Sequence, residues 1–102
     1  MNKDLQIAKK TVQAEIQALK KLSLSFNRTS YFSNAVNILS KMKGKCLVVG
    51  VGKSYIVSLK VSATLSSLGT PSVAFSANDL QHGGLSVIQK NNDVLLLSLI
   101  HI

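Results

Sequence analysis

Residues 46–54 join an apolar run to a glycine turn, a lysine and a serine, in the order Cys-Leu-Val-Val-Gly-Val-Gly-Lys-Ser. The run is typical of a buried strand, and the lysine stands where a helix would begin. The first N–H groups of a helix have no partner within it and carry a partial positive charge. A turn that lets the backbone approach a ligand closely, with Lys53 beside it, therefore predicts a phosphate site.

Two common phosphate motifs do not fit this segment. A P-loop would need glycine at position 47, where the chain has Leu47, and the dinucleotide fingerprint fails at its third glycine, where the chain has Tyr55. No acidic residue follows at the distance that a ribose contact requires. The mismatches argue against a nucleoside triphosphatase and against a nicotinamide enzyme. A turn in which Gly50 and Gly52 only connect a strand to a helix remains the structural alternative.

Lys53 and His82 are the side chains best suited to chemistry. Lys53 can pair with a phosphate or stabilise an oxyanion, and because the helix dipole disfavours a cation at a helix start, its position favours a functional role. His82 can transfer a proton as a neutral imidazole, or bind a divalent metal such as zinc with ligands from elsewhere. A solvent-facing lysine and a structural histidine remain the plain alternatives.

Three motifs in order resemble the sugar isomerase (SIS) family, and within it the D-arabinose 5-phosphate isomerases. They are Gly-Lys-Cys-Leu-Val-Val-Gly-Val-Gly-Lys-Ser at 44–54, Leu-Gly-Thr-Pro-Ser at 68–72 and Gln-His-Gly-Gly-Leu-Ser at 81–86. The chain departs from the family at Tyr55 and Gly84, where the family has glycine and aspartate. It departs again after Ser98, where the family continues with Ser-Asn-Ser-Gly-Glu.

The resemblance implies an aldose-ketose isomerase that interconverts D-ribulose 5-phosphate and D-arabinose 5-phosphate through an enediol, in lipopolysaccharide biosynthesis. Lys53 and His82 are the predicted catalytic residues, and no cofactor is required. The residues predicted to bind the sugar phosphate are Gly50, Gly52, Ser54 and Ser98. The resemblance also implies a homo-oligomer, a tetramer at full length. A non-catalytic sugar-phosphate sensor is the alternative, since SIS domains also serve as effector-binding modules.

The spacing of the apolar residues predicts the helices and strands that must position these residues. Apolar residues three or four apart predict a helix over 5–22, and Thr29 or Ser30 can cap a second helix. Strands are predicted at 46–51, 71–76 and 93–97, with a helix from Lys53 to about Leu68. The side chains expected to be buried on that helix are Ile56, Leu59, Val61, Ala63, Leu65 and Leu68. The apolar faces of the two N-terminal helices need an apolar surface to pack on, either the sheet or another subunit.

Strand-helix-strand order predicts an α/β fold with a parallel, incomplete doubly wound sheet of the flavodoxin-like type. Ligands of such sheets bind beyond the carboxyl ends of the strands. We expect a helical pair at 1–43 and the first part of an SIS domain at 44–98. The strand count predicts an N-terminal fragment, and 99–102 reads as a non-native tail in which His101 has no role. Because the family also uses acidic and histidine residues from later in its sequence, the resemblance implies little or no activity for this fragment alone.

Composition limits the partners. The net charge of +8 comes from scattered lysines with few aromatic residues, so no specific nucleic-acid role is expected. The single cysteine, Cys46, excludes a disulfide framework and is predicted to lie in the core. No apolar span is long enough for a membrane helix and no signal-peptide core precedes the first helix, so a cytoplasmic protein with no membrane partner is expected.

Overall fold

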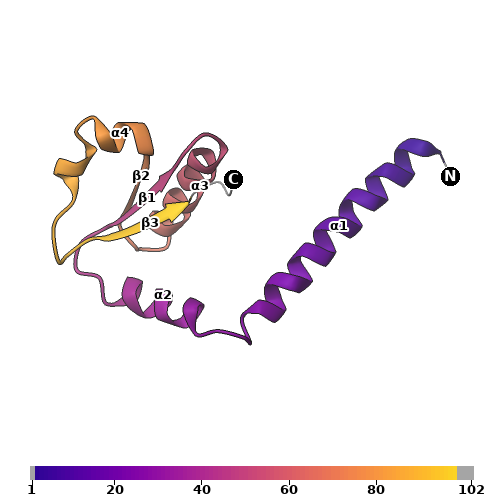
Figure 1. The fold of residues 1–102 in the computed structure, drawn as a ribbon, viewed down its shortest axis with the longest axis horizontal. Coiled ribbons are helices and arrows are strands. Elements are labelled where there is room, and N and C mark those ends of the chain that lie inside the picture. The colour runs from indigo at the N-terminus through magenta and orange to yellow at the C-terminus, as the bar shows by residue number, and fades with distance from the viewer. Residues whose placement is uncertain (1, 99–102) are drawn as a thin grey trace. The chain divides into compact units, whose positions relative to one another are not determined.

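A computed structural model describes residues 2–98, and the chain divides into two compact units between Val36 and Asn37 (Figure 1). The predicted tail at 99–102 lies outside the described residues. Within 2–98, none of the helices is long and apolar enough to cross a membrane.

The first two elements of the chain are helices, as predicted, and the unit boundary falls within the second. Helix α1 spans Lys3–Ser25 and helix α2 spans Tyr31–Ser40. Asn2 caps α1, because its side-chain oxygen accepts a hydrogen bond from the N–H of Leu5 at 2.9 Å. The rings of Phe26 and Phe32 lie 5.0 Å apart and join the two helices at their corner.

The second unit contains a parallel sheet, which confirms the predicted α/β class. Strands β1 (Cys46–Gly50), β2 (Ser72–Ser76) and β3 (Val94–Ser98) pair in the order β2-β1-β3. Helix α3 (Lys53–Ser67) packs on β1 and β2, while α4 (Ala77–Gln81) and the 3₁₀ turn η1 (Gly84–Val87) lie between β2 and β3 (Figure 1). Strands β2 and β3 each begin one residue later than predicted.

Strand β1 is the core of this unit. Its first four residues, Cys46, Leu47, Val48 and Val49, are 0–2% exposed. A central parallel strand is covered on both faces, which explains its continuous apolar sequence. Burial also raises the pKa of the Cys46 thiol. Cys46 is therefore a small buried core residue, as predicted.

The predicted buried face of α3 is wrong in part. Ile56, Leu59 and Leu68 are 65%, 47% and 78% exposed, and Ala63 is also exposed, whereas Val61 and Leu65 are half-buried. The buried residues of α3 are Ser58 and Ser62. The helix start approaches β1 closely at Gly50, so small side chains face the sheet. Ser58 satisfies its hydroxyl by donating to the carbonyl of Ser54 at 2.8 Å.

A buried ion pair ties the amino ends of β1 and β3 together. Asp93, whose side chain is 1% exposed, accepts hydrogen bonds from the Lys45 ammonium at 2.8 Å, the Lys45 backbone N–H at 2.9 Å and the Gln89 N–H at 2.8 Å. The Lys45 ammonium also donates to the Val87 carbonyl at 2.8 Å. A side chain at Gly44 would collide with the Asp93 carboxylate, so glycine is required there.

We expect this ion pair to set the acid stability of the second unit. The hydrogen bond from the Lys45 side chain, with those from the Gln89 and Lys45 backbones, lowers the pKa of Asp93 to about 2. A carboxyl group with a depressed pKa stabilises the fold above its unfolded pKa of about 3.9, and this contribution is lost as the pH falls towards the folded value. Urea unfolding at pH 6 and pH 2.5 should therefore show a large deficit for Asp93→Asn at the higher pH and a smaller one at the lower. An equal deficit at both would contradict the assignment.

Candidate functional site

Three residues form a row at the carboxyl edge of the sheet. Gly50 ends β1 and is in register with Ser76 at the end of β2 and with Ser98 at the end of β3. Neighbouring strands lie about 4.8 Å apart, so the two serines flank Gly50 closely. The sequence predicted Ser98 as a binding residue. Ser76 was not among the predicted site residues, and the strand register places it beside Gly50.

The turn after β1 requires glycine at two positions for different reasons. A Cβ on Gly50 would lie 2.5 Å from the carbonyl carbon and oxygen of Ser54, so the start of α3 can pack on the strand only if residue 50 has no side chain. Gly52 has φ +57°, a conformation that L side chains rarely adopt, and open space where its Cβ would be. The backbone at Gly52 is therefore accessible to a ligand.

The start of α3 offers unpaired donors. The N–H of Ser54 bonds to the Val51 carbonyl at 3.0 Å, and the N–H of Tyr55 bonds to the Gly52 carbonyl at 3.0 Å. Within residues 2–98, the N–H groups of Gly52 and Lys53 have no hydrogen-bond partner. No side chain caps this fifteen-residue helix. Two adjacent free N–H groups at a helix start are suited to binding an anion.

Lys53 and Ser54 are the first two residues of α3. Lys53 is exposed, and the ion pair found within 2–98 is that of Lys45, so the Lys53 ammonium is available to a ligand. Ser54 is half-buried, with its carbonyl taken by Ser58. The four predicted residues Gly50, Gly52, Lys53 and Ser54 therefore lie together at one turn, next to Ser98.

His82 follows the neighbouring strand β2 by way of α4. The Ser76 hydroxyl caps α4 by accepting from the N–H of Asp79 at 3.1 Å, and the N–H of His82 closes the helix by donating to the carbonyls of Asn78 and Asp79. Its side chain is exposed. At about 1.5 Å of rise per residue, His82 lies roughly 9 Å along the helix from Ser76. Within residues 2–98 no hydrogen bond joins His82 to Lys53, although both follow adjacent strand ends.

The glycines after His82 fit a close turn. Gly83 has φ +115°, and Gly84 is buried, with its would-be Cβ 2.9 Å from the carbonyl oxygen of Asp79. An aspartate at position 84, which the resemblance would place there, needs this turn to shift. With glycine at position 84, η1 packs directly against α4.

A metal site at His82 would need ligands from beyond residues 2–98. In that range, no three side chains of histidine, cysteine, aspartate or glutamate lie close enough together to hold an ion. A hollow of about 360 Å³ does occur in the N-terminal unit, but it is lined by residues 25–32 and contains none of the predicted site residues.

The chain is similar to known proteins in sequence and in fold. A comparison with models of protein families finds no match. The chain is 43% identical over 67 residues to the arabinose 5-phosphate isomerase KdsD of Pseudomonas aeruginosa, covering 66% of this chain and 21% of that protein. It is 33% identical over 93 residues to KdsD of Yersinia pestis, covering 91% of this chain and 28% of that protein.

A solved structure agrees with these relatives. An Escherichia coli CFT073 protein in complex with arabinose 5-phosphate superposes with a TM-score of 0.84 at 33% identity, covering 95% of this chain and 51% of that one. The chain is homologous to the arabinose 5-phosphate isomerases. The predicted resemblance is thereby confirmed. This isomerase homologue spans less than a third of the length of the curated relatives that it matches.

Proposed function

We propose that the chain supplies the phosphate-binding edge of an isomerase that interconverts D-ribulose 5-phosphate and D-arabinose 5-phosphate. The observation that carries the proposal is the start of α3, where the N–H groups of Gly52 and Lys53 are unpaired beside a free lysine ammonium. Ser54 and Ser98 add hydroxyl groups to this anion-binding site. The homologous isomerases and the arabinose 5-phosphate complex of the E. coli relative support sugar phosphate as the ligand.

The proposed reaction moves one proton between adjacent carbons. A base removes a proton from C1 of the ketose and gives an enediol, and the proton is returned at C2 while a hydroxyl proton moves from O1 to O2, so no group is gained or lost. His82, exposed at the end of α4, is proposed as the proton-transfer group, and Lys53 as the residue that holds the phosphate or stabilises the enediolate oxygen. A fixed phosphate anchors the sugar while the proton moves.

Further parts of the proposal concern the whole protein. We propose that it acts in the cytoplasm as a homo-oligomer, a tetramer, and that the 102-residue chain alone turns over little substrate. No cofactor is required for the proposed proton transfer. A zinc ion held by His82 and residues from outside 2–98 is the alternative use of this histidine.

A non-catalytic sugar-phosphate sensor is the second candidate function. Two observations favour it: Tyr55 stands in the first turn of α3, where the family has glycine, and Gly84 replaces the family's aspartate after His82. Neither change removes the free N–H groups at the start of α3. Phosphate binding could therefore persist while proton transfer is lost.

A chimaera tests the proposal and separates the candidates. Residues 2–98 would replace the homologous segment of Y. pestis KdsD, and the purified chimaera would be assayed for formation of arabinose 5-phosphate and, by calorimetry, for binding of the same sugar phosphate. Turnover with D-ribulose 5-phosphate is the expected result. Binding without turnover would favour the sensor, and a folded chimaera that neither binds arabinose 5-phosphate nor turns over substrate would contradict both.

A further inference from the structure

Tyr55 is the third residue of α3 and directly follows Lys53 and Ser54. Its backbone nitrogen lies over the end of β1, since a Cβ built on Gly50 would come within 2.7 Å of it. Gly50 is the middle residue of the row at the carboxyl edge of the sheet. The side chain of Tyr55 therefore starts beside the centre of the candidate site.

The ring of Tyr55 belongs to the sheet-facing side of α3. Positions 55, 58 and 62 share one side of a helix, because they are three and seven residues apart. The other two positions are Ser58 and Ser62, the buried residues of α3. Tyr55 is half-buried, whereas the next two residues along the helix, Ile56 and Val57, are 65% and 55% exposed. The ring is therefore held towards the sheet and away from solvent.

The packing of α3 places this ring towards the β2 side of the edge. Helix α3 packs on β1 and β2 far more than on β3. It runs back over the sheet from the carboxyl end of β1, so its first turn lies at the carboxyl ends of β1 and β2. Strand β2 ends there at Ser76 and continues into α4, which leads to His82. Tyr55 is therefore on the side of the edge from which His82 follows.

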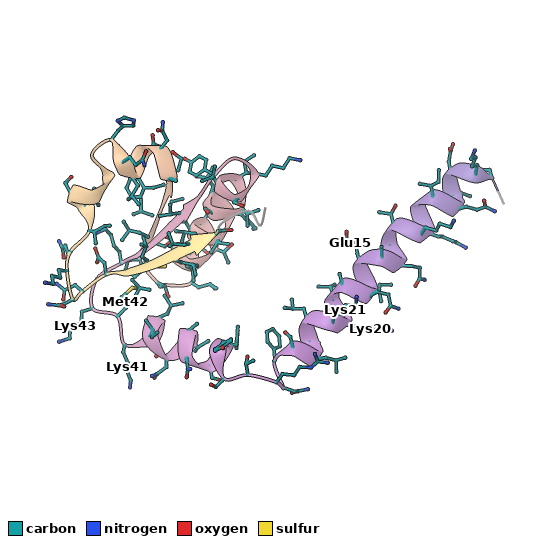
Figure 2. All side chains as sticks on the ribbon, in the orientation of Figure 1. Glu15, Lys20, Lys21, Lys41, Met42 and Lys43 are labelled. Atoms are coloured by element: carbon teal, nitrogen blue, oxygen red, sulfur yellow. The ribbon has the colours of Figure 1, made fainter. Side chains whose placement is uncertain are left out.

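The positive charges set the direction in which a sugar phosphate would lie at this edge. Lys53 and the unpaired N–H groups found within residues 2–98 are at the start of α3. Lys41 and Lys43, which Figure 2 labels between α2 and β1, precede the amino end of the strand instead. With its phosphate at the start of α3, the sugar extends towards His82 by way of Tyr55.

We propose that Tyr55 determines substrate specificity, because its ring limits the sugar phosphate to five carbons. The inference rests on the proposed function, since it takes the start of α3 as the phosphate end of the site. Glycine, which the related family has at this position, has no side chain to occupy this space. A tyrosine ring is large and has few rotatable bonds, so it limits the space with little loss of conformational entropy.

Two ligands that differ by one carbon test the proposal. D-Glucose 6-phosphate has the configuration of D-arabinose 5-phosphate at the three stereocentres nearest the phosphate, and one further carbon at the other end. Calorimetry would give the dissociation constants of both for the chimaera of residues 2–98 with Y. pestis KdsD and for its variants. Tyr55→Ala should raise the affinity for the six-carbon ligand, relative to the five-carbon ligand, by about tenfold, the effect of one carbon in a closely fitting pocket.

Three variants and one further ligand control for other effects. Tyr55→Phe keeps the ring, and Ile56→Ala shortens the exposed neighbour, so both should keep the affinity ratio within about twofold of the unmutated chimaera. Tyr55→Gly restores the residue of the related family and replaces the alanine variant if that variant does not fold. Inorganic phosphate should bind every variant equally, because the ring limits the carbon chain and leaves the anion site unchanged.

The outcomes separate this inference from the proposed function. Binding of D-arabinose 5-phosphate with the same affinity ratio before and after removal of the Tyr55 ring would overturn the inference and leave the proposed phosphate site intact. A ratio that changes as much in Tyr55→Phe would also overturn it, because the hydroxyl group would then be responsible. A changed ratio in Tyr55→Ala without turnover of D-ribulose 5-phosphate would support the inference for a non-catalytic site. A folded chimaera that binds neither sugar phosphate would contradict both.

Discussion

Replacing Lys53 with alanine is expected to lower kcat/KM for D-ribulose 5-phosphate by about 100-fold to 1,000-fold, the range seen when one preorganised donor to an anion is removed. Lys53 is the first residue of α3, and within residues 2–98 its own N–H and that of Gly52 are unpaired. Its ammonium is the free charge best placed to meet a ligand at that turn. The measurement is steady-state isomerisation by the chimaera with Y. pestis KdsD.

Two controls make this result specific to Lys53. Lys60→Ala removes the same charge from an exposed site on the same helix and should change kcat/KM less than about twofold. Activity with unphosphorylated ribulose separates the two proposed roles: if Lys53 only holds the phosphate, Lys53→Ala should cause no additional loss with that substrate. If it stabilises the enediolate, the loss should persist. Unchanged turnover of the phosphorylated substrate would remove Lys53 from the site.

Replacing His82 with alanine is expected to reduce kcat by about 100-fold to 10,000-fold, the range for loss of a general acid-base group. His82 is exposed at the end of α4, so its imidazole is accessible to a sugar held at the adjacent strand ends. Added imidazole should restore part of the activity of His82→Ala, because a diffusible base can occupy the space that the side chain leaves. Exchange of the C1 proton with deuterated solvent should fall in parallel with kcat.

A substitution of the neighbouring residue Gln81 and a test for metal dependence are the controls for His82→Ala. Gln81→Ala truncates the exposed residue before His82 and should keep nearly full activity. Loss of activity on treatment with a chelator, with recovery on addition of zinc, would instead assign His82 to a metal. A His82→Ala variant with full activity would show that the histidine is structural.

Much of the fold could be predicted because its signals are local. The unbroken apolar run at 46–49 identified the central strand, and Gly50, Gly52 and Lys53 marked the turn and helix start that follow it. The strand order then implied that the carboxyl ends meet at one edge. Register confirms this for Gly50 and Ser98.

The remainder depended on distances between segments, which the sequence does not encode locally. Hydrophobicity predicted Ile56 and Leu59 as the buried side of α3, but the close approach at Gly50 places Ser58 and Ser62 there. The strand register gives the exact pairing of Ser76 with Gly50, which the sequence pattern did not predict. Ser58 and Ser62 are four residues apart and follow a glycine at a strand end. This pattern is the signal that would have identified the buried face of α3.

The ion pair between Lys45 and Asp93 lies at the opposite end of β1 from Gly50. A five-residue strand separates them by roughly 16 Å, a distance at which the effects of two substitutions are generally additive. Acid stability and the proposed sugar-phosphate binding can therefore vary independently in this chain. Substitutions at the carboxyl edge around Gly50 could accumulate during divergence while the opposite end of the sheet kept the strands in register.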